Sequence, residues 1–452
     1  MNAIKWPNEV VYQIFPDRWC NGDPSNDVRT GEYVRHGEPV RKSTSVAHLT
    51  SPRLHQRCFY GGDLAGIIRT IPYLVDLGVT VVYLTPIFSA GSTHKYDADD
   101  YFTIDRHFGS RQVYEELVRA LHAAGIKLVL DGVFNHTSFD HPWYRDPARR
   151  RRFYCMKTRE EPMTWMNGRS LPKLNPERPE VQRELLRVIE AWPEIDGWRL
   201  DAAHLLPVTF LIKLKRKVES LGRTRIVIME DWTDSSGHFQ DRICDGVTNF
   251  LFRDAVERFL VEDCSPETLL KRLSAWIHRY PWPNVVQSWN LLDNHDTFRL
   301  YSRVGRQTDR FKIAQVLQFT LPGTPMIYQG DEIGMTGKTD AESRAPMIWD
   351  QSRWNAEILA HTRFLTGLRR RHPVLSRGRW RPLLAVNANR VLAYERRAPS
   401  GARAVVAIND GYAPFDLRLP PVRTRIPPHA YGLWISDAGA RGRLICSWRK
   451  EG

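Results

Sequence analysis

The chain has 452 residues, of which 42% are hydrophobic and 26% are charged, and its formal net charge is +14. This composition excludes an intrinsically disordered protein, and the length suffices for one large domain with smaller ones attached. No apolar stretch reaches the roughly 20 residues of a membrane-spanning helix and the N-terminus lacks a signal-peptide pattern, so we expect a cytoplasmic protein without a membrane partner.

The cysteines and the basic charge do not indicate thiolate or nucleic-acid chemistry. The six cysteines stand singly, without a CxxC pair, which favours free thiols in a reducing compartment. Basic residues cluster at 145–152 and 369–371, but no recognised nucleic-acid module accompanies them. We interpret these clusters as solvated surface and expect no nucleic-acid partner.

From residue 10 to about residue 335, short apolar runs alternate with amphipathic segments. The predicted strands are Val10–Phe15, Val79–Leu84, Lys127–Val133, Gly197–Asp201, Arg225–Met229, Gly246–Phe250, Val285–Leu292 and Pro325–Tyr328. Helical patterns between them include Val113–Ala124, Pro179–Trp192 and Phe210–Leu221. This β-then-α alternation predicts an α/β fold, a closed (β/α)₈ TIM barrel, although periodicity alone also permits a doubly wound sheet.

Two segments depart from the alternation. Residues 137–175 form a connection rich in Pro, Arg, Trp and Tyr, which predicts a small inserted domain after strand 3 that walls the active site. After about residue 372 the pattern changes to short β-like runs, which predicts a C-terminal all-β sandwich domain. The predicted boundaries are 1–136 and 176–371 for the two parts of the catalytic barrel, 137–175 for the insertion and 372–452 for the C-terminal domain.

Polar side chains follow four of the predicted strands, where barrel enzymes carry their reacting groups. They are Asp131, Asn135, His136, Arg199, Asp201, Glu230, His295 and Asp296. Burying so many ionisable groups is costly unless they are paired or functional. We therefore predict an active site here; the alternative is a structural Arg–Asp pair with a surface glutamate.

Carboxylates beside an arginine suit retaining cleavage of a glycosidic bond, in which one carboxylate attacks the anomeric carbon and a second donates a proton. Arg199 lies two residues before Asp201, so both side chains point to the same side of one strand, and the guanidinium can keep the carboxylate ionised. Glu230 lies between Met229 and Trp232, an apolar setting that suits a proton donor.

Four ordered motifs surround these residues. They are Asp131-Gly-Val-Phe-Asn-His136, Gly197-Trp-Arg-Leu-Asp201, Met229-Glu-Asp-Trp232 and Leu292-Asp-Asn-His-Asp296. They resemble the signature regions of the α-amylase family, glycoside hydrolase family 13. The further segments Tyr12–Arg18, Asn21–Asp27, Tyr83–Phe88, His94–Asp97 and Leu171–Asn175 are similar to its neopullulanase, cyclomaltodextrinase and maltogenic amylase branch, and the resemblance runs from about residue 10 to residue 350.

The resemblance implies roles at the matching positions. Asp201 would form the covalent glycosyl intermediate, Glu230 would be the general acid/base, and Asp296 would hold substrate hydroxyls. The predicted substrate-binding residues are Tyr96, His136, Arg199, Trp232, His295, Asp340 and Arg344. For the aromatic side chains among them, simple core packing is the alternative.

One segment predicts a metal site away from the chemistry. Asn21, Asp23, Asn26 and Asp27 place four oxygen-bearing side chains within seven residues, and hard oxygen donors suit Ca²⁺. Spacing alone slightly favours a solvated Asx-rich turn. The resemblance adds Gly61 and Asp63 as ligands, so it implies a structural Ca²⁺; we expect no organic cofactor.

The resemblance implies a retaining α-glucan hydrolase that cleaves α-1,4 bonds of maltodextrins or cyclodextrins, with α-1,6 cleavage left open. One alternative is a transglycosylase or a sucrose- or trehalose-type glucoside isomerase of the same family. Another is a non-catalytic barrel for binding or assembly, against which the intact carboxylates argue.

Two departures from the branch bear on specificity and assembly. His204-Leu205 stand where the branch commonly has an Asn–Glu pair, and Asp231 follows Glu230 where an apolar residue is usual, so substrate preference does not carry over. The branch usually carries an N-terminal domain before the barrel, whereas this sequence begins near the first strand. The oligomeric state therefore stays open.

Overall fold

The structure is a computed structural model that describes residues 4–35, 37–45, 56–167, 170–240, 242–420, 422–436 and 443–447. Eight parallel strands close into a barrel in the order β1-β14-β13-β12-β11-β10-β9-β6. They are β1 (Val11–Ile14), β6 (Val81–Leu84), β9 (Lys127–Gly132), β10 (Gly197–Leu200), β11 (Ile226–Asp231), β12 (Gly246–Asn249), β13 (Trp289–Leu291) and β14 (Thr324–Tyr328). The predicted TIM barrel is confirmed.

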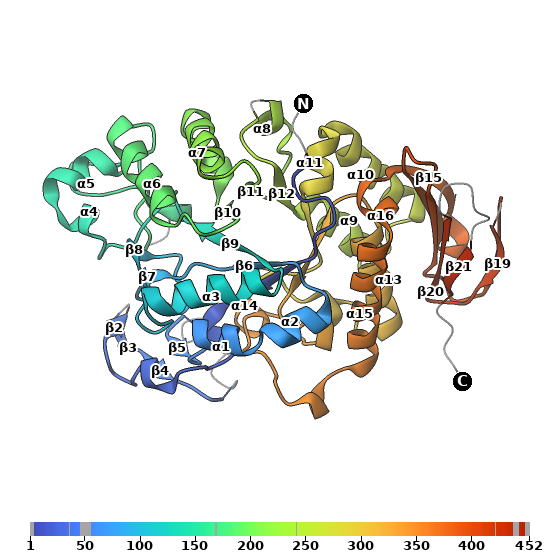
Figure 1. Cartoon of the computed structure of the whole chain (residues 1–452), viewed down its shortest axis with the longest axis horizontal. Helices are drawn as coiled ribbons and strands as arrows, with labels where there is room; N and C mark the ends of the chain where they lie inside the picture. The colour runs from blue at the N-terminus through green and yellow to red at the C-terminus, as the bar shows by residue number, and fades with distance from the viewer. Residues whose placement is uncertain are drawn as a thin grey trace.

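Helices surround the barrel, and most of them bury one face against it (Figure 1). The main ones are α1 (Leu64–Arg69), α2 (Ile71–Leu77), α3 (Arg111–Ala123), α6 (Pro179–Ala191), α7 (Val208–Leu221), α9 (Phe250–Leu260), α10 (Pro266–Arg279), α13 (Thr308–Thr320) and α15 (Ala356–Arg371). Helix α3 shows why they form where they do. Ser110 caps its start by accepting from the Val113 amide, and Gly125 follows its end at a φ of +73°.

The expectation of a single strand over residues 285–292 was wrong. Residues Trp282–Gln287 form helix α11, Ser288 turns the chain, and only β13 continues as a strand. Pro283 lies in the first turn of α11, where proline favours a helix start. The short apolar run fits either structure by its periodicity, so the proline and tertiary packing decide.

Shorter elements sit above the carboxyl ends of the strands. The segment between β9 and β10 contains α4 (Pro142–Arg145) and α5 (Pro147–Phe153), at the left of Figure 1, and bridges such as His136↔Lys173 tie it to the barrel rim. A second excursion after β6 forms a hairpin of β7 (Phe88–Ala90) and β8 (Ala98–Ile104). The remaining short elements are β2 (Val34–Arg35), β3 (Glu38–Pro39), β4 (Arg41–Lys42), β5 (Cys58–Phe59), α8 (Ser236–Gln240), α12 (Leu300–Arg303), α14 (Asp340–Ser343) and α16 (Pro373–Arg377).

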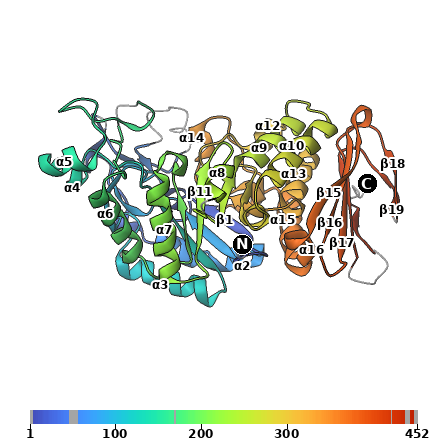
Figure 2. The ribbon, with the colours of Figure 1, turned by 90° about the horizontal axis from the view of Figure 1, so that it is seen from above.

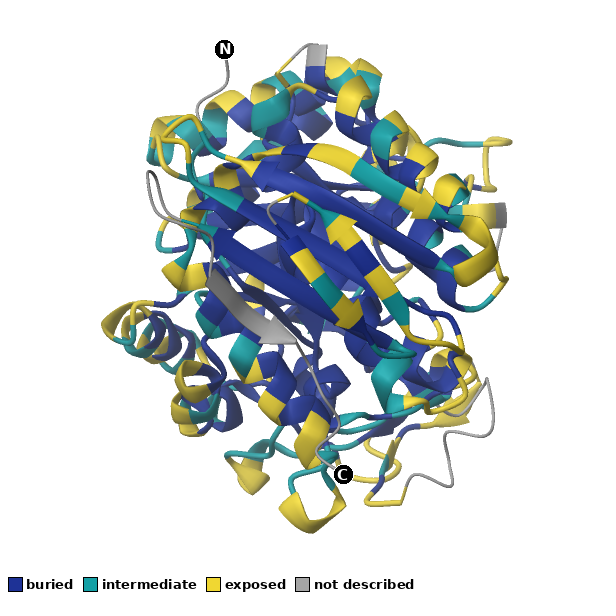
Figure 3. Ribbon diagram, turned by 90° about the vertical axis from the view of Figure 1, so that its right-hand side faces the viewer, coloured by how far each residue is buried: buried dark blue, intermediate teal, exposed yellow. Residues whose placement is uncertain are grey.

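Beyond α16 the chain forms antiparallel sheets, as predicted for the C-terminal part (Figure 2). One sheet has the order β15 (Arg379–Val386), β16 (Val391–Arg397), β17 (Arg403–Asn409), β20 (Ala430–Ser436), β21 (Arg443–Ser447), and the other pairs β18 (Phe415–Leu419) with β19 (Val422–Ile426). Apolar side chains such as Val405, Leu417 and Trp434 fill the space between the two sheets. The central strands of the larger sheet are accordingly buried in Figure 3.

Within the described residues, no helix combines the length and the apolar composition needed to cross a membrane. The thiols of Cys58 and Cys244 are free and buried, and those of Cys20, Cys155 and Cys264 are free and partly buried. The side chain of Cys446 lies outside the described residues.

Candidate active site

The register of the barrel brings the strand-end residues to one level. Arg199 on β10 lies opposite Asp131 on β9 and opposite Ile228 on β11. Because side chains alternate along a strand, Asp201 and Glu230 lie on the same side of the sheet as Arg199, one step nearer the carboxyl ends. Neighbouring parallel strands therefore place two carboxylates side by side above one guanidinium.

Arg199 joins three carboxylates. Its Nη1 lies 2.9 Å from both Oδ atoms of Asp131 and 2.9 Å from Oδ1 of Asp201, and its Nη2 lies 2.9 Å from Oε1 of Glu230. All four side chains are buried. The planar guanidinium thus fixes the two predicted catalytic carboxylates on its two terminal nitrogens.

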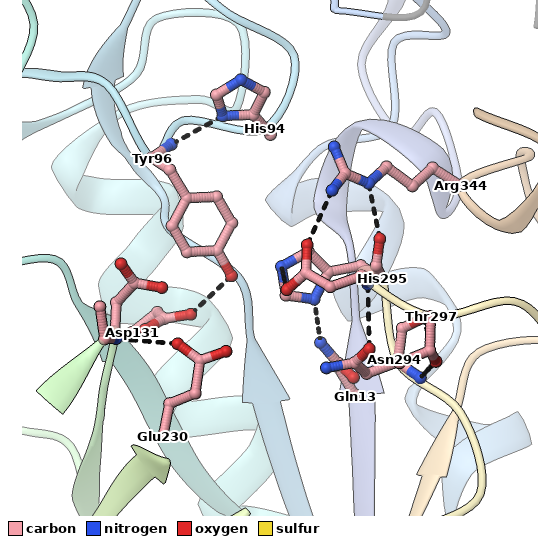
Figure 4. Close-up of polar contacts among 12 residues, drawn as sticks. Gln13, His94, Tyr96, Asp131, Glu230, Asn294, His295, Thr297 and Arg344 are labelled. Atoms are coloured by element: carbon pink, nitrogen blue, oxygen red, sulfur yellow. Dashed lines mark hydrogen bonds and ion pairs between the residues drawn. The ribbon is translucent and has the colours of Figure 1, made fainter. Parts of the chain in front are cut away.

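Both oxygens of Asp131 are engaged. The hydroxyl of Tyr96 donates to its Oδ2 at 2.8 Å (Figure 4), and the hydroxyl of Tyr83 donates to the same oxygen at 2.6 Å, in addition to the Arg199 contacts. Burial raises the pKa of Asp131, while Arg199 acts in the opposite direction. With both oxygens engaged, Asp131 orients Arg199 and Tyr96.

Asp201 does not have the electrostatic setting that sequence reasoning assumed. Burial, followed by repulsion from Glu230, raises the pKa of Asp201 well above its ordinary value, and Arg199 opposes this only in part. The expectation that the guanidinium simply keeps Asp201 ionised was incomplete, because one positive charge serves three buried carboxylates.

Glu230 is surrounded by hydrogen-bond donors, so the expected apolar setting was wrong. The indole N–H of Trp232 donates to its Oε1 at 3.1 Å, and the amide of Ala202 donates to its Oε2 at 2.8 Å. The Trp232 ring stacks on Phe250 with centroids 3.8 Å apart. Ala202 adopts a left-handed φ of +45°, a turn directly after Asp201 whose amide reaches Glu230.

The two predicted histidines are neutral donors. Burial lowers the pKa of His136 to about 4, and burial with the nearby Arg344 and Arg199 lowers the pKa of His295 well below its usual range. The side-chain amide of Asn135 lies 3.2 Å from Nδ1 of His136, and that of Gln13 lies 2.9 Å from Nδ1 of His295. Since an amide N–H can only donate, each imidazole carries its proton on Nε2.

The Nε2 atoms of the two imidazoles differ in what they contact. Nε2 of His136 is buried and has no hydrogen-bond partner within the described part of the chain. Nε2 of His295 lies 3.1 Å from Oδ2 of Asp296. The Tyr96 ring stacks on His295 with centroids 5.2 Å apart and an angle of 5° between the planes. His136 therefore presents a donor that can bind a ligand hydroxyl.

Arg344 lies across the site from Tyr96 and Glu230 (Figure 4) and holds Asp296 there. Arg344 Nη2 donates to Asp296 Oδ1 at 2.8 Å, and its Nε donates to the carbonyl of His295 at 2.6 Å. Asp340, four residues earlier on α14, is exposed in the same loop. The arginine thereby fixes Asp296 in the cavity that Asp201 and Glu230 also line.

These groups line one cavity of about 980 Å³. All three predicted catalytic carboxylates line it, as do all the predicted substrate-binding residues except Arg199, which lies beneath Asp201 and Glu230. Sequence reasoning did not single out the further lining residues Gln56, His94, Trp165, Met166, Ser170 and Leu171 as site residues. Most of these belong to the segment predicted as an active-site wall. The ring centroids of Trp165 and His136 are 5.5 Å apart.

A larger hollow of about 1160 Å³ lies elsewhere, beside Trp19, Tyr60 and Trp349. None of the strand-end carboxylates lines it. A site for glycosidic cleavage needs paired carboxylates, so the smaller cavity is the candidate active site.

The six predicted calcium ligands also come together, around the start of α1, and none of them lines the active-site cavity. The side-chain oxygens of Asn21 and Asn26 are buried and accept no hydrogen bond from any described residue. Asn21 Nδ2 donates to Asp27 Oδ1 at 2.9 Å, so these oxygens lie near a carboxylate. Ca²⁺ binds amide and carboxylate oxygens, so this group of side chains suits it.

Comparison with known proteins assigns the family. The family model of the α-amylase catalytic domain matches residues 13–373. The chain belongs to the α-amylase family. It is 38% identical to neopullulanase 2 of Thermoactinomyces vulgaris over 90% of this chain and 70% of that protein. It is 36% identical to a cyclomaltodextrinase of Geobacillus thermopakistaniensis over 83% of this chain and 64% of that protein.

A solved structure of a family member spans nearly the whole fold. The cyclic α-maltosyl-(1→6)-maltose hydrolase of Arthrobacter globiformis superimposes with a TM-score of 0.86 and 29% identity, over 97% of this chain and 100% of that chain. The present chain is therefore a glycoside hydrolase, an α-glucan hydrolase related to cyclomaltodextrinases and neopullulanases. These matches favour the enzyme over the non-catalytic barrel.

Proposed function

We propose that this α-amylase family member hydrolyses α-1,4 glucosidic bonds of maltodextrins or cyclodextrins with retention of configuration. Asp201 is the nucleophile, Glu230 the general acid/base and Asp296 the third carboxylate. The observation that carries this proposal is the contact of Arg199 with both Asp201 and Glu230 at the floor of one cavity. Two carboxylates held on one guanidinium are close enough for the direct attack of a retaining enzyme.

The reaction proceeds in two displacements. A carboxylate oxygen of Asp201 bonds to the anomeric carbon while the bond to the leaving oxygen breaks and Glu230 protonates that oxygen. Water then attacks the same carbon, Glu230 takes its proton, and the Asp201–glycosyl bond breaks. Throughout, Arg199 holds the attacking carboxylate of Asp201 on one terminal nitrogen and Glu230 on the other.

The surrounding groups bind the sugar at the glycone side. His136 donates from its free Nε2, and His295, Asp296 and Arg344 offer a second set of donors and acceptors for hydroxyls. Tyr96 supplies an aromatic face for the sugar ring. Neutral imidazoles suit this task because they donate to hydroxyls without placing a positive charge beside the oxocarbenium-like transition state.

An oligosaccharide rather than a monosaccharide glycoside is the substrate. The cavity of about 980 Å³ is open to several sugar units, and Asp340 and Trp232 lie along its wall. The related Arthrobacter globiformis hydrolase has been solved with cyclic α-maltosyl-(1→6)-maltose and with maltose. His204 and Leu205, which replace the usual Asn–Glu pair, also line the cavity and set the preference among maltodextrin, cyclodextrin and α-1,6-linked substrates.

The test is the anomeric configuration of the first product. Proton NMR of the enzyme acting on maltotriose should show α-configured reducing ends before mutarotation. Product in the β-configuration would refute the assigned roles. Parallel reactions with cyclodextrin, pullulan and sucrose measure the bond preference. Accumulation of oligosaccharides longer than maltotriose would show that the intermediate is passed to sugars, as in the transglycosylase alternative.

We also propose a Ca²⁺ site, remote from the chemistry, and a cytoplasmic location. The ion would be held by Asn21, Asp23, Asn26, Asp27, Gly61 and Asp63, where it would link the segment after β1 to the start of α1. The free thiols of the described cysteines and a 32% identical relative, the intracellular maltogenic amylase of Bacillus subtilis, support a cytoplasmic location. Metal analysis after dialysis against calcium tests the first proposal, and cell fractionation tests the second.

A further inference from the structure

A lysine reaches into the group of predicted calcium ligands. Lys42 ends the short strand β4, which pairs with β5 just before Tyr60. Its ammonium lies 2.5 Å from Oδ1 of Asp27 and donates to the carbonyl of Tyr60 at 3.1 Å. The side chains of Lys42 and Asp27 are 24% and 22% exposed, so the ion pair is largely shielded from water. The contact therefore differs from an ordinary surface salt bridge.

The ammonium lies beside three of the six predicted ligands, Asp27, Asn21 and Gly61. Gly61 has a φ of +79°, and a β-carbon built there would lie 1.9 Å from Lys42 Nζ, 2.1 Å from Asp27 Oδ1 and 2.8 Å from Asn21 Nδ2. Three side chains thus meet beside a residue that has no side chain of its own. A cation bound by Asp27, Asn21 and Gly61 would have to share this space with the lysine nitrogen.

The other predicted carboxylate ligands are already engaged. Both oxygens of Asp63 accept backbone amides, Oδ1 from Gly22 and Gly66 and Oδ2 from Asp23. Oδ1 of Asp23 accepts the amide of Ser25 on the exposed side of the loop. Asp27 is consequently the carboxylate whose charge needs a cation, and the single charge of Lys42 balances it.

We infer that Lys42 is a built-in cation that holds this loop closed without metal, and that Ca²⁺ binds only when it displaces the lysine from Asp27. A divalent ion and an ammonium within a few ångströms of each other repel strongly in a partly buried site. Lysine also lies on a flexible stem and can swing out when the ion enters. The site is then a weak, exchangeable calcium site in a fold that does not depend on the ion.

The experiment measures thermal unfolding and calcium affinity of the full chain and of Lys42→Met. The wild-type Tm should be the same in EDTA and in micromolar free calcium. The methionine variant should lose several degrees in EDTA and regain them with calcium, and should bind calcium at least about tenfold more tightly by titration calorimetry. Lys127→Met is the matched control. It removes the partly buried pair with Glu9, so it should lower the Tm equally with and without calcium.

Each other result overturns the inference. A wild-type protein that retains calcium through dialysis and loses several degrees in EDTA would show that the ion, not Lys42, holds the loop; the calcium proposal would then stand alone. A Lys42→Met variant with unchanged calcium affinity would show that the two cations do not compete. Neither readout uses catalysis, so the result is independent of the proposed hydrolase activity.

Discussion

Replacing Arg199 by Met tests the central feature of the site. The change removes the one positive charge that contacts Asp131, Asp201 and Glu230, and Arg199 is 1% exposed. Removing one partner of a buried ion pair typically costs about 3–5 kcal/mol, because uncompensated charge remains inside the protein. We expect a loss of this size in the free energy of unfolding at pH 8, measured by urea titration with tryptophan fluorescence.

The pH dependence of this loss has a defined sign. Burial already raises the pKa values of Asp131 and Asp201, and without the guanidinium they rise further. A carboxyl whose pKa is raised by folding binds more protons in the folded than in the unfolded state, so it favours the fold at low pH and this contribution is lost as pH rises. The destabilisation should therefore shrink by about 1–2 kcal/mol between pH 8 and pH 5.

The activity of the Arg199 variants separates charge from geometry. Arg199→Met should lower kcat/KM by about 10²–10³-fold. Arg199→Lys should recover part of the stability but little of the activity, because an ammonium cannot hold two carboxylates on two nitrogens. Arg310→Met, which breaks the pair with Asp410 at the C-terminal sheet, should lower stability and leave kcat/KM unchanged. A loss of stability that is equal at pH 5 and pH 8 would refute this account.

Three further predictions concern single side chains. Asp201→Asn and Glu230→Gln should each lower kcat on maltotriose by several orders of magnitude, and near-full activity in either variant would be incompatible with the proposed nucleophile and acid/base. Asp201→Asn should not lower the Tm, because burial already disfavours the charged form of Asp201. The folded-state pKa of His136 is about 4, so its contribution to stability falls as pH drops from about 6.5 toward 4, and His136→Gln should make the urea-midpoint profile less steep in that range, while His141, His295 and His361 keep part of the slope. Trp232→Phe keeps an aromatic ring for the stack on Phe250 but removes the donor to Glu230, so kcat should fall several-fold with little change in KM; a changed KM alone would contradict this.

The barrel and its strand-end residues could be predicted because they follow from local rules. Apolar runs with helical segments between them dictate parallel strands, and parallel strands place the residues after them on one rim. Asp201 and Glu230 are therefore recognisable in the sequence. The same local reasoning failed at residues 285–292, where a short apolar run fits a helix as well as a strand. The domain boundaries stay predictions, although the antiparallel strands begin at Arg379, a few residues after the expected change.

The electrostatics of the site could not be predicted in the same way. Sequence reasoning assigned Arg199 to Asp201 alone and an apolar setting to Glu230. In the structure Arg199 contacts three carboxylates, and the indole N–H of Trp232 donates to Glu230. The net charge of a site depends on which side chains converge in space. Residues that are neighbours in the sequence are only some of these side chains.

The sequence by itself determined the order of strands and helices, the family motifs and the residue types at the strand ends, since each depends on neighbours in the chain. Only the tertiary structure decided which protons and charges those residues carry. Gln13, 282 positions away in the sequence, determines which ring nitrogen of His295 carries the proton. Lys42 contacts Asp27 because β4 pairs with β5, and no sequence motif predicts that pairing. Hydrogen bonds and Coulomb interactions act over a few ångströms, and only folding brings such distant residues within that range.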